Sequence, residues 1–99
     1  MHLYLIHCGF YDDATSFGGV FESHTNFFLV AHSPEDARQK AKASEFFKSK
    51  RMHVDGIQQI DAVDGFQIAL VPDKESGSQL TRIESFQFRD LVPARPPQP

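Results

Sequence analysis

The sequence predicts an α+β domain in which one helix packs on one face of a β-β-α-β-β sheet, with an extra strand or short helix at the C-terminal end. Three observations predict this order. Two apolar, strand-like runs come first, a proline-capped helical segment follows them, and an Asp-Gly dipeptide joins two further strand-like runs. With 99 residues, 40% of them apolar and 23% charged, the chain has the size and composition of a single globular domain.

The first two strands are expected at residues 2–8 and 25–31. Both runs are apolar at nearly every position, which is typical of strands that are covered on both faces. Gly9 ends the first run, and residues 9–23 have the glycine and aspartate content of a long loop that also contains four aromatic side chains. We expect the second strand to lie in the middle of the sheet, beside the first.

The helix that follows has the clearest local signal in the chain. Ser33 suits the N-cap and Pro34 the first helical position, while Glu35 and Asp36 place negative charge at the positive end of the helix dipole. We expect this helix to continue to about residue 48. The small alanines among its apolar positions predict that it lies close to the sheet.

The third and fourth strands are expected at residues 56–63 and 66–71. Asp64-Gly65 between them indicates a type I′ turn, because that turn needs positive φ at both central residues. The two strands should therefore be antiparallel neighbours. The domain is expected to end at residue 92, after a segment at 80–91 that fits an edge strand or a short helix. Residues 93–99 contain four prolines and are expected to form a disordered tail.

A single helix leaves the other face of such a sheet without cover. Either the C-terminal segment or a second subunit has to cover it, and the ten phenylalanines favour a homodimer that packs through this face. We expect core positions for four of them: Phe27, Phe28, Phe47 and Phe66. Residues 10–21 hold three more phenylalanines inside the expected loop, where a subunit interface or the wall of a pocket would explain them.

Composition and motifs exclude several other classes of protein. Cys8 is the single cysteine, so the chain is not a disulfide scaffold, and we expect it to be a buried apolar side chain. The net charge is −3 and no nucleic-acid motif accompanies the basic residues at 38–51, so nucleic acid is not an expected partner. No run is long enough to cross a membrane, and no signal-peptide pattern is present, so we expect a cytoplasmic protein. Gly18-Gly19 lacks the context of a nucleotide-binding loop, so no cofactor is expected.

Two short motifs each pair a carboxylate with an imidazole: Glu22 with His24, and His53 with Asp55. In extended backbone, residues two apart lie on the same face. One motif stands at the entry to the second strand and the other just before the third. Because a helix between parallel strands carries the chain back across the sheet, the entries to both strands lie at the same end. The two motifs can therefore converge.

These four residues are our catalytic candidates. An imidazole held by a carboxylate is the unit from which general bases are built, and two imidazoles with two carboxylates also suit a hard or borderline metal ion. Hydrogen-bonded structural roles at strand ends are the third alternative, and no metal ion is assigned. Convergence of the four side chains within about 4 Å of one point would favour an enzyme or a metal protein.

Several of these segments together resemble a known family. They are the strand at residues 3–6 with Gly9 after it, the two carboxylate-imidazole motifs, Phe28-x-Val30-Ala31, and the run from Ile60 to Phe66. In these segments the chain resembles small bacterial domains grouped as domain of unknown function 1543, over residues 1 to about 72. The resemblance implies the fold described above, and members with two tandem copies imply that such domains pair. It implies no reaction, because the family has no assigned activity.

We therefore expect a bacterial cytoplasmic module that self-associates and binds a protein partner or small ligand near the strand-entry end of the sheet. The alternative is a small enzyme or metal-binding protein that uses His24 and His53, oriented by Glu22 and Asp55. The sequence leaves open whether the protein is an enzyme.

Overall fold

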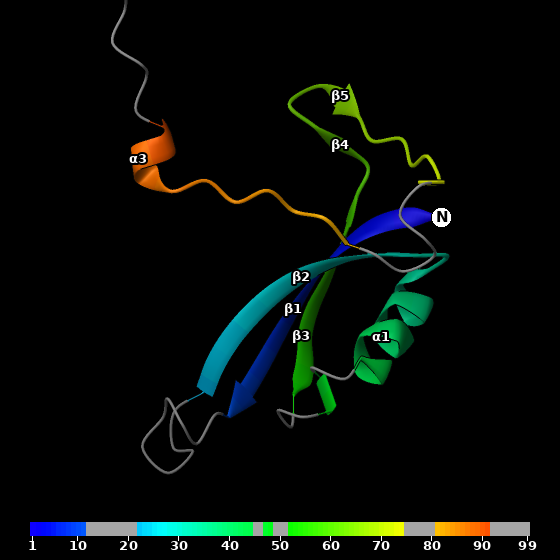
Figure 1. The fold of residues 1–99 in the computed structure, drawn as a ribbon. Coiled ribbons are helices and arrows are strands. Elements are labelled where there is room, and N and C mark those ends of the chain that lie inside the picture. Colours follow the sequence, from blue (N-terminus) through cyan, green and yellow to red (C-terminus); the bar gives the residue numbers. More distant parts are fainter. Residues whose placement is uncertain (12–21, 45–46, 49–51, 75–80, 92–99) are drawn as a thin grey trace, which may run out of the picture.

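The computed structural model describes residues 1–11, 22–44, 47–48, 52–74 and 81–91. Its main sheet contains β1 (His2–Tyr11), β2 (Glu22–Ala31) and β3 (His53–Ile60), and helix α1 (Pro34–Ala43) packs on one face of it (Figure 1). The short strands β4 (Ala62–Val63) and β5 (Phe66–Gln67) form a second, two-stranded sheet, and the last element is the short helix α3 (Phe88–Leu91). The predicted α+β class and the order β-β-α-β-β are confirmed.

β1 is the central strand of the main sheet, in the order β2-β1-β3. It pairs in antiparallel fashion with β2 on one side and with β3 on the other. β2 and β3 therefore run parallel to each other on either side of β1, and α1 connects them as a crossover helix. The prediction that the second strand lies in the middle was wrong, because β1 is the strand that pairs along both of its edges.

α1 begins as the sequence predicts. The Ser33 side chain accepts a hydrogen bond from the backbone N–H of Asp36 (3.1 Å), and the Asp36 carboxylate accepts one from the backbone N–H of His32 (3.0 Å). The helix ends at Ala43 rather than near residue 48. Ser44 leaves the helical conformation, and its hydroxyl donates a hydrogen bond to the carbonyl oxygen of Ala41 (2.8 Å), so a local cap ends the helix.

The core lies between α1 and the face of the sheet that α1 covers. Tyr4, Ile6 and Cys8 enter it from alternate positions of β1, and all three are fully buried. Ala37 and Ala41, one helical turn apart, meet them from α1, which confirms that the helix lies close to the sheet. Partly buried apolar side chains surround this core: Phe10, Phe27, Leu29, Phe47, Val54 and Ile57.

Burial keeps both ionisable side chains of this core protonated. It raises the pKa of Tyr4, with a further contribution from nearby carboxylates, and the Tyr4 hydroxyl donates a hydrogen bond to Gln59 Oε1 (3.1 Å). Burial also raises the pKa of the Cys8 thiol, and the negative charge of Asp55 adds to the effect. Because the thiolate is the reactive form of cysteine, the raised pKa and the full burial of Cys8 agree with the expected role of a buried apolar side chain.

The first two strands are longer than predicted, and the third starts earlier. β1 continues through Gly9 to Tyr11, so Phe10 is part of a strand and packs against the core instead of lying in a loop. β3 begins at His53 rather than at residue 56. The predictions for Phe17, for Phe21 and for the tail at 93–99 lie outside the described residues.

The β4–β5 hairpin stands apart from the main sheet (Figure 1). Asp64 and Gly65 have φ values of 52° and 83°, which confirms the turn that the sequence predicts. Each strand of the hairpin has only two residues, however, and residues 66–71 do not join the main sheet. The core positions predicted for two phenylalanines were therefore wrong, since Phe66 is 76% exposed and Phe28, on the edge strand β2, is 44% exposed.

The described part of the C-terminal segment extends away from the sheet (Figure 1). Its described side chains, at residues 81–87, 89 and 91, are all exposed. Since this segment is exposed, no described element covers the sheet face away from α1.

No described helix has the length and apolar character needed to cross a bilayer; α1, with 10 residues, is longer than α3.

Candidate metal centre

The sheet face away from α1 has an apolar half and a polar half. Leu3 and Leu5 of β1 lie beside Val30 and Phe28 of β2 in the apolar half. The polar half lies at the end where β2 and β3 begin. There, five side chains from all three strands form what we call the His–carboxylate cluster: His7, Glu22, His24, His53 and Asp55.

Strand register explains how the two predicted motifs meet. Gly9 of the central strand pairs with His24 of β2 on one side and with His53 of β3 on the other. Because directly opposed residues in a ladder point to the same face, both imidazoles rise from the sheet on either side of Gly9. Glu22 lies two residues before His24 on β2 and therefore shares this face.

Asp55 lies two residues after His53 on β3 and shares its face, and an irregularity in the strand follows it. His7 pairs with Gly56 and Cys8 pairs with Val54, so Asp55 is an extra residue in the ladder. Such a bulge breaks the strict alternation of side chains and allows two successive residues, here Asp55 and Gly56, to serve one face. Val54 then packs toward the core, while Asp55 joins His53 on the open face.

The first part of the cluster centres on His53. Its Nε2 atom lies 2.6 Å from Glu22 Oε1 and 3.0 Å from Asp55 Oδ1. One imidazole nitrogen thus faces a carboxylate oxygen from β2 and another from its own strand. We call these three residues triad A.

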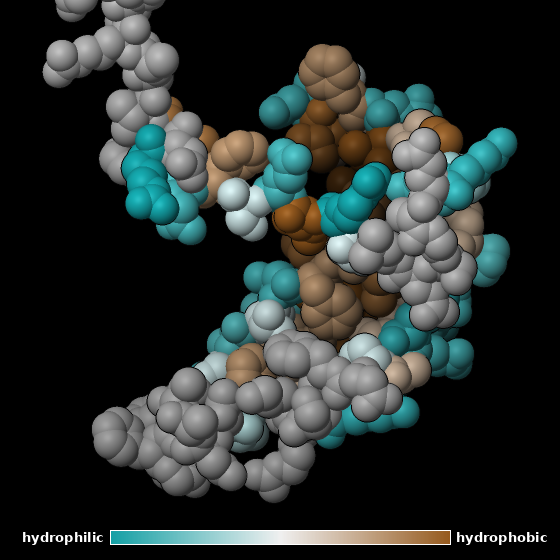
Figure 2. All heavy atoms as spheres, in the orientation of Figure 1, coloured by the Kyte–Doolittle hydropathy of each residue, from teal (hydrophilic) through white to brown (hydrophobic). Residues whose placement is uncertain are grey.

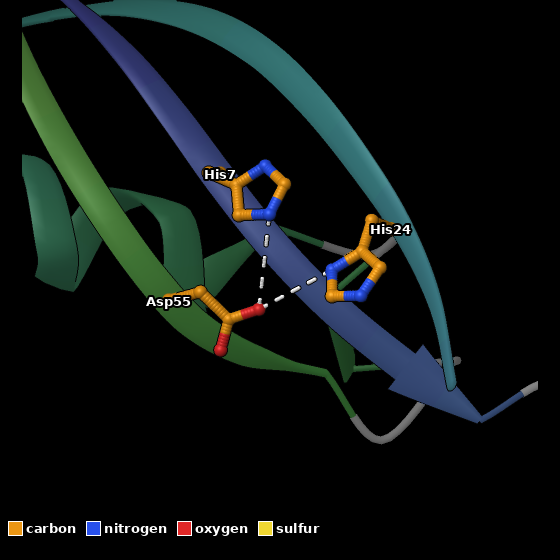
Figure 3. Close-up of side chains that lie close together, drawn as sticks. All are labelled: His7, His24 and Asp55. Carbon is orange, nitrogen blue, oxygen red and sulfur yellow. Dashed lines mark ion pairs between the residues drawn. The ribbon is translucent and has the colours of Figure 1, made fainter. Parts of the chain in front are cut away.

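The second part, triad B, consists of His7, His24 and Asp55, which point toward one another from three different strands (Figure 3). Asp55 Oδ2 lies 3.4 Å from His24 Nδ1 and 3.9 Å from His7 Nε2. The two imidazole rings are stacked, with centroids 5.1 Å apart. His7 Nδ1 donates a hydrogen bond to Asn26 Oδ1 (2.6 Å), so the proton of a neutral His7 lies on Nδ1 and the lone pair of Nε2 faces the cluster.

Gly9 forms the floor of the cluster. A Cβ atom at this position would lie 2.7 Å from His53 Nε2 and 2.8 Å from Asp55 Oδ2, and it would overlap Glu22 Oε1. Carbon does not approach nitrogen or oxygen so closely without a bond. The polar atoms therefore occupy space that any other residue in the middle of β1 would fill.

The cluster is open to solvent but is not fully exposed. Its five side chains retain between 30% and 49% of their accessible surface. Two carboxylates with neutral imidazoles give the group a negative charge, which attracts cations. The cluster is thus a partly desolvated, negatively charged set of nitrogen and oxygen donors that a dissolved ion can reach.

The structure brings together all four residues that the sequence singles out. The contacts that link Glu22, His53, Asp55 and His24 measure 2.6, 3.0 and 3.4 Å, and they run from one residue to the next. Sequence reasoning missed His7, although strand alternation correctly separates it from Cys8. The missing signal was the register between β1 and β2, which decides that His7 stands near His24.

Two groups of possible metal ligands are present among the described residues, and they are triads A and B. In each triad, one ligand atom per residue lies within 4.8 Å of the others. Imidazole nitrogen and carboxylate oxygen together suit divalent first-row ions such as Zn²⁺, Co²⁺, Fe²⁺ and Mn²⁺. The donor set and its spacing therefore fit a metal ion.

A family model described as Domain of Unknown Function (DUF1543) matches residues 19–70, just over half of the 99-residue chain. This segment contains four members of the cluster and excludes His7 and Gly9. No curated protein matches the chain, and no solved structure matches it.

Proposed function

The chain belongs to the domain of unknown function 1543 family, as the sequence resemblance implied, and we propose that it is a ligand-binding module whose ligand is a divalent first-row transition-metal ion. The ion binds in the His–carboxylate cluster. The observation that carries this proposal is the convergence of imidazole and carboxylate donors from three strands above the bare backbone of Gly9.

A metal ion would give the donor atoms of the cluster a common partner. His53 Nε2 carries at most one proton, yet it faces carboxylate oxygens at 2.6 and 3.0 Å, so one hydrogen would have to serve two acceptors. His7 uses its Nδ1 proton on Asn26, which turns an unprotonated nitrogen toward Asp55. A divalent cation takes a lone pair from the donor atoms of one triad and offsets part of their negative charge.

Titration with Zn²⁺ or Co²⁺ tests this function. We expect chelator-treated protein to bind either ion, as measured by isothermal titration calorimetry, and to unfold at a higher temperature when the ion is present. Loss of a group that only holds a metal ligand in place weakens metal binding by roughly 10–100-fold. Because His53→Gln removes a ligand itself, it should weaken metal binding by at least as much. Acidification should also release the ion, because protons compete for the imidazole nitrogens.

His32→Gln is the matched control, because His32 is exposed and lies outside the cluster. This variant should bind metal as the unchanged protein does. The proposal fails if the unchanged protein binds neither ion at millimolar concentration, or if His53→Gln and His32→Gln bind with equal affinity.

Self-association is a second function, supported by the exposure of apolar side chains in the described residues 63–74 and 81–91. Val71 is 84% exposed and Phe86 is 62% exposed, and apolar side chains gather over the β4–β5 hairpin (Figure 2). Large apolar side chains on an extended segment are stabilised when a second copy of the chain buries them.

Light scattering after size-exclusion chromatography tests this function. We expect twice the 11.2 kDa mass of one chain. A double variant, Phe66→Ser with Phe86→Ser, should return the mass to that of one chain and leave the helix and sheet intact by circular dichroism. Gln67→Ser, an exposed polar neighbour on β5, is the control and should remain dimeric. A monomer at every concentration of the unchanged protein would refute self-association.

A further inference from the structure

We propose that the His–carboxylate cluster holds two cations bridged by Asp55, an inference that rests on the metal-binding function proposed above. Triad A and triad B have one residue in common, which is Asp55. Each triad offers three donor atoms, the number that protein residues supply to many catalytic zinc sites. The cluster therefore has enough ligands for two ions if Asp55 serves both.

The two oxygens of Asp55 face different triads. Oδ1 lies 3.0 Å from His53 Nε2 in triad A, while Oδ2 lies 3.4 Å from His24 Nδ1 in triad B. A carboxylate that bridges two metal ions gives one oxygen to each. In known two-metal sites the ions are about 3.5–4 Å apart, a separation that a single carboxylate spans. The orientation of Asp55 is therefore that of a bridging ligand.

The remaining donors do not cross between the triads. Glu22 contacts His53, and His7 is oriented by Asn26 toward the Oδ2 side of Asp55. The stacked rings of His7 and His24 place two imidazoles on that same side (Figure 3). A single ion near His53 would leave these two imidazoles without a role, whereas a second ion uses both.

Charge indicates what else such a site binds. Two carboxylates do not balance two divalent ions, so the loaded cluster carries excess positive charge. Three protein donors leave open coordination positions on each ion, and the side chains are partly exposed, so an external ligand can reach both ions. The ligand class that fits is an oxyanion such as phosphate, whose oxygens bind two ions at once.

Counting bound Co²⁺ tests the two-cation site. Native mass spectrometry and calorimetry of chelator-treated protein should give two Co²⁺ per chain. Glu22→Ala removes a ligand from triad A only, and His24→Ala removes one from triad B only, so each variant should retain one Co²⁺. Mn²⁺-loaded protein should show spin coupling between the ions in electron paramagnetic resonance, and Asp55→Asn should abolish it. His32→Ala is the control and should bind two ions.

The outcomes separate this inference from the function on which it rests. One Co²⁺ per unchanged chain overturns the two-cation site and leaves metal binding intact, whereas no Co²⁺ overturns both. Inorganic phosphate should change the visible absorption of the protein with two Co²⁺ bound and should not bind the metal-free protein. No change in absorption on adding phosphate would overturn the assignment of an oxyanion ligand.

Discussion

Replacing Gly9 with alanine should reduce metal affinity by at least about 100-fold, more than the roughly 10–100-fold that loss of an outer-shell partner costs. The new methyl group would occupy the space where atoms of Glu22, His53 and Asp55 now meet. These atoms are the ends of side chains that can rotate outward to solvent, so the sheet can form while the donors separate. The free energy of unfolding should change little or rise. Alanine loses less backbone entropy than glycine on folding, and this difference stabilises a protein by about 0.4–1 kcal/mol. Calorimetric titration with Co²⁺ and urea unfolding measure the two effects.

Gly56→Ala is the matched control for this prediction. Gly56 also lies in the sheet beside the cluster, but a Cβ atom there would have His7 Cβ as its nearest neighbour, at an ordinary 3.9 Å. This variant should therefore keep its metal affinity. If Gly9→Ala binds Co²⁺ as tightly as Gly56→Ala does, the ions do not lie above Gly9 and the proposed centre is wrong.

Replacing Ile6 with alanine should have the largest effect on stability. Ile6 is fully buried in the central strand, where it pairs with Phe27 on one side and with Ile57 on the other. Loss of a buried isoleucine side chain costs about 2–5 kcal/mol, because its apolar contacts are lost and a cavity remains. The free energy of unfolding of small domains is only about 5–15 kcal/mol, so this substitution should remove a large part of the stability. Urea unfolding of the metal-free protein measures the difference.

Leu5→Ala tests whether the core lies on the side where α1 packs. Leu5 is the neighbour of Ile6 on the opposite face and is only partly buried. Leu5→Ala should therefore reduce the free energy of unfolding clearly less than Ile6→Ala does. An equal or larger cost would contradict this placement of the core and would indicate that the open face is buried in solution.

Elements that depend on local interactions were predictable from the sequence. The start of α1 follows from Ser33 and Pro34, whose effects act within one helical turn. The β4–β5 turn follows from Asp64-Gly65, because few other dipeptides adopt positive φ at both positions. The end of α1 was not predicted, since Ser44 ends the helix through hydrogen bonds that compete with continued helix.

The site was predictable in part for the same reason. Residues two apart on a strand share a face, and parallel strands joined by a helix begin at the same end, so Glu22, His24, His53 and Asp55 could be grouped. His7 could not be added to the group. Its place beside His24 depends on the pairing of β1 with β2, and a shift of one residue in that pairing would turn it to the other face.

The sequence by itself determined the class of fold, the helix start, the turn and the two carboxylate-imidazole pairs, because each depends on neighbours along the chain. Tertiary structure alone decided that β1 is the central strand, that Gly9 lies under the cluster, and that Asp55 belongs to both triads. It also decided that Phe66 is exposed. The physical reason is common to these features. Strand order, register and bulges depend on contacts between segments distant in sequence, and these contacts form only when the whole sheet assembles.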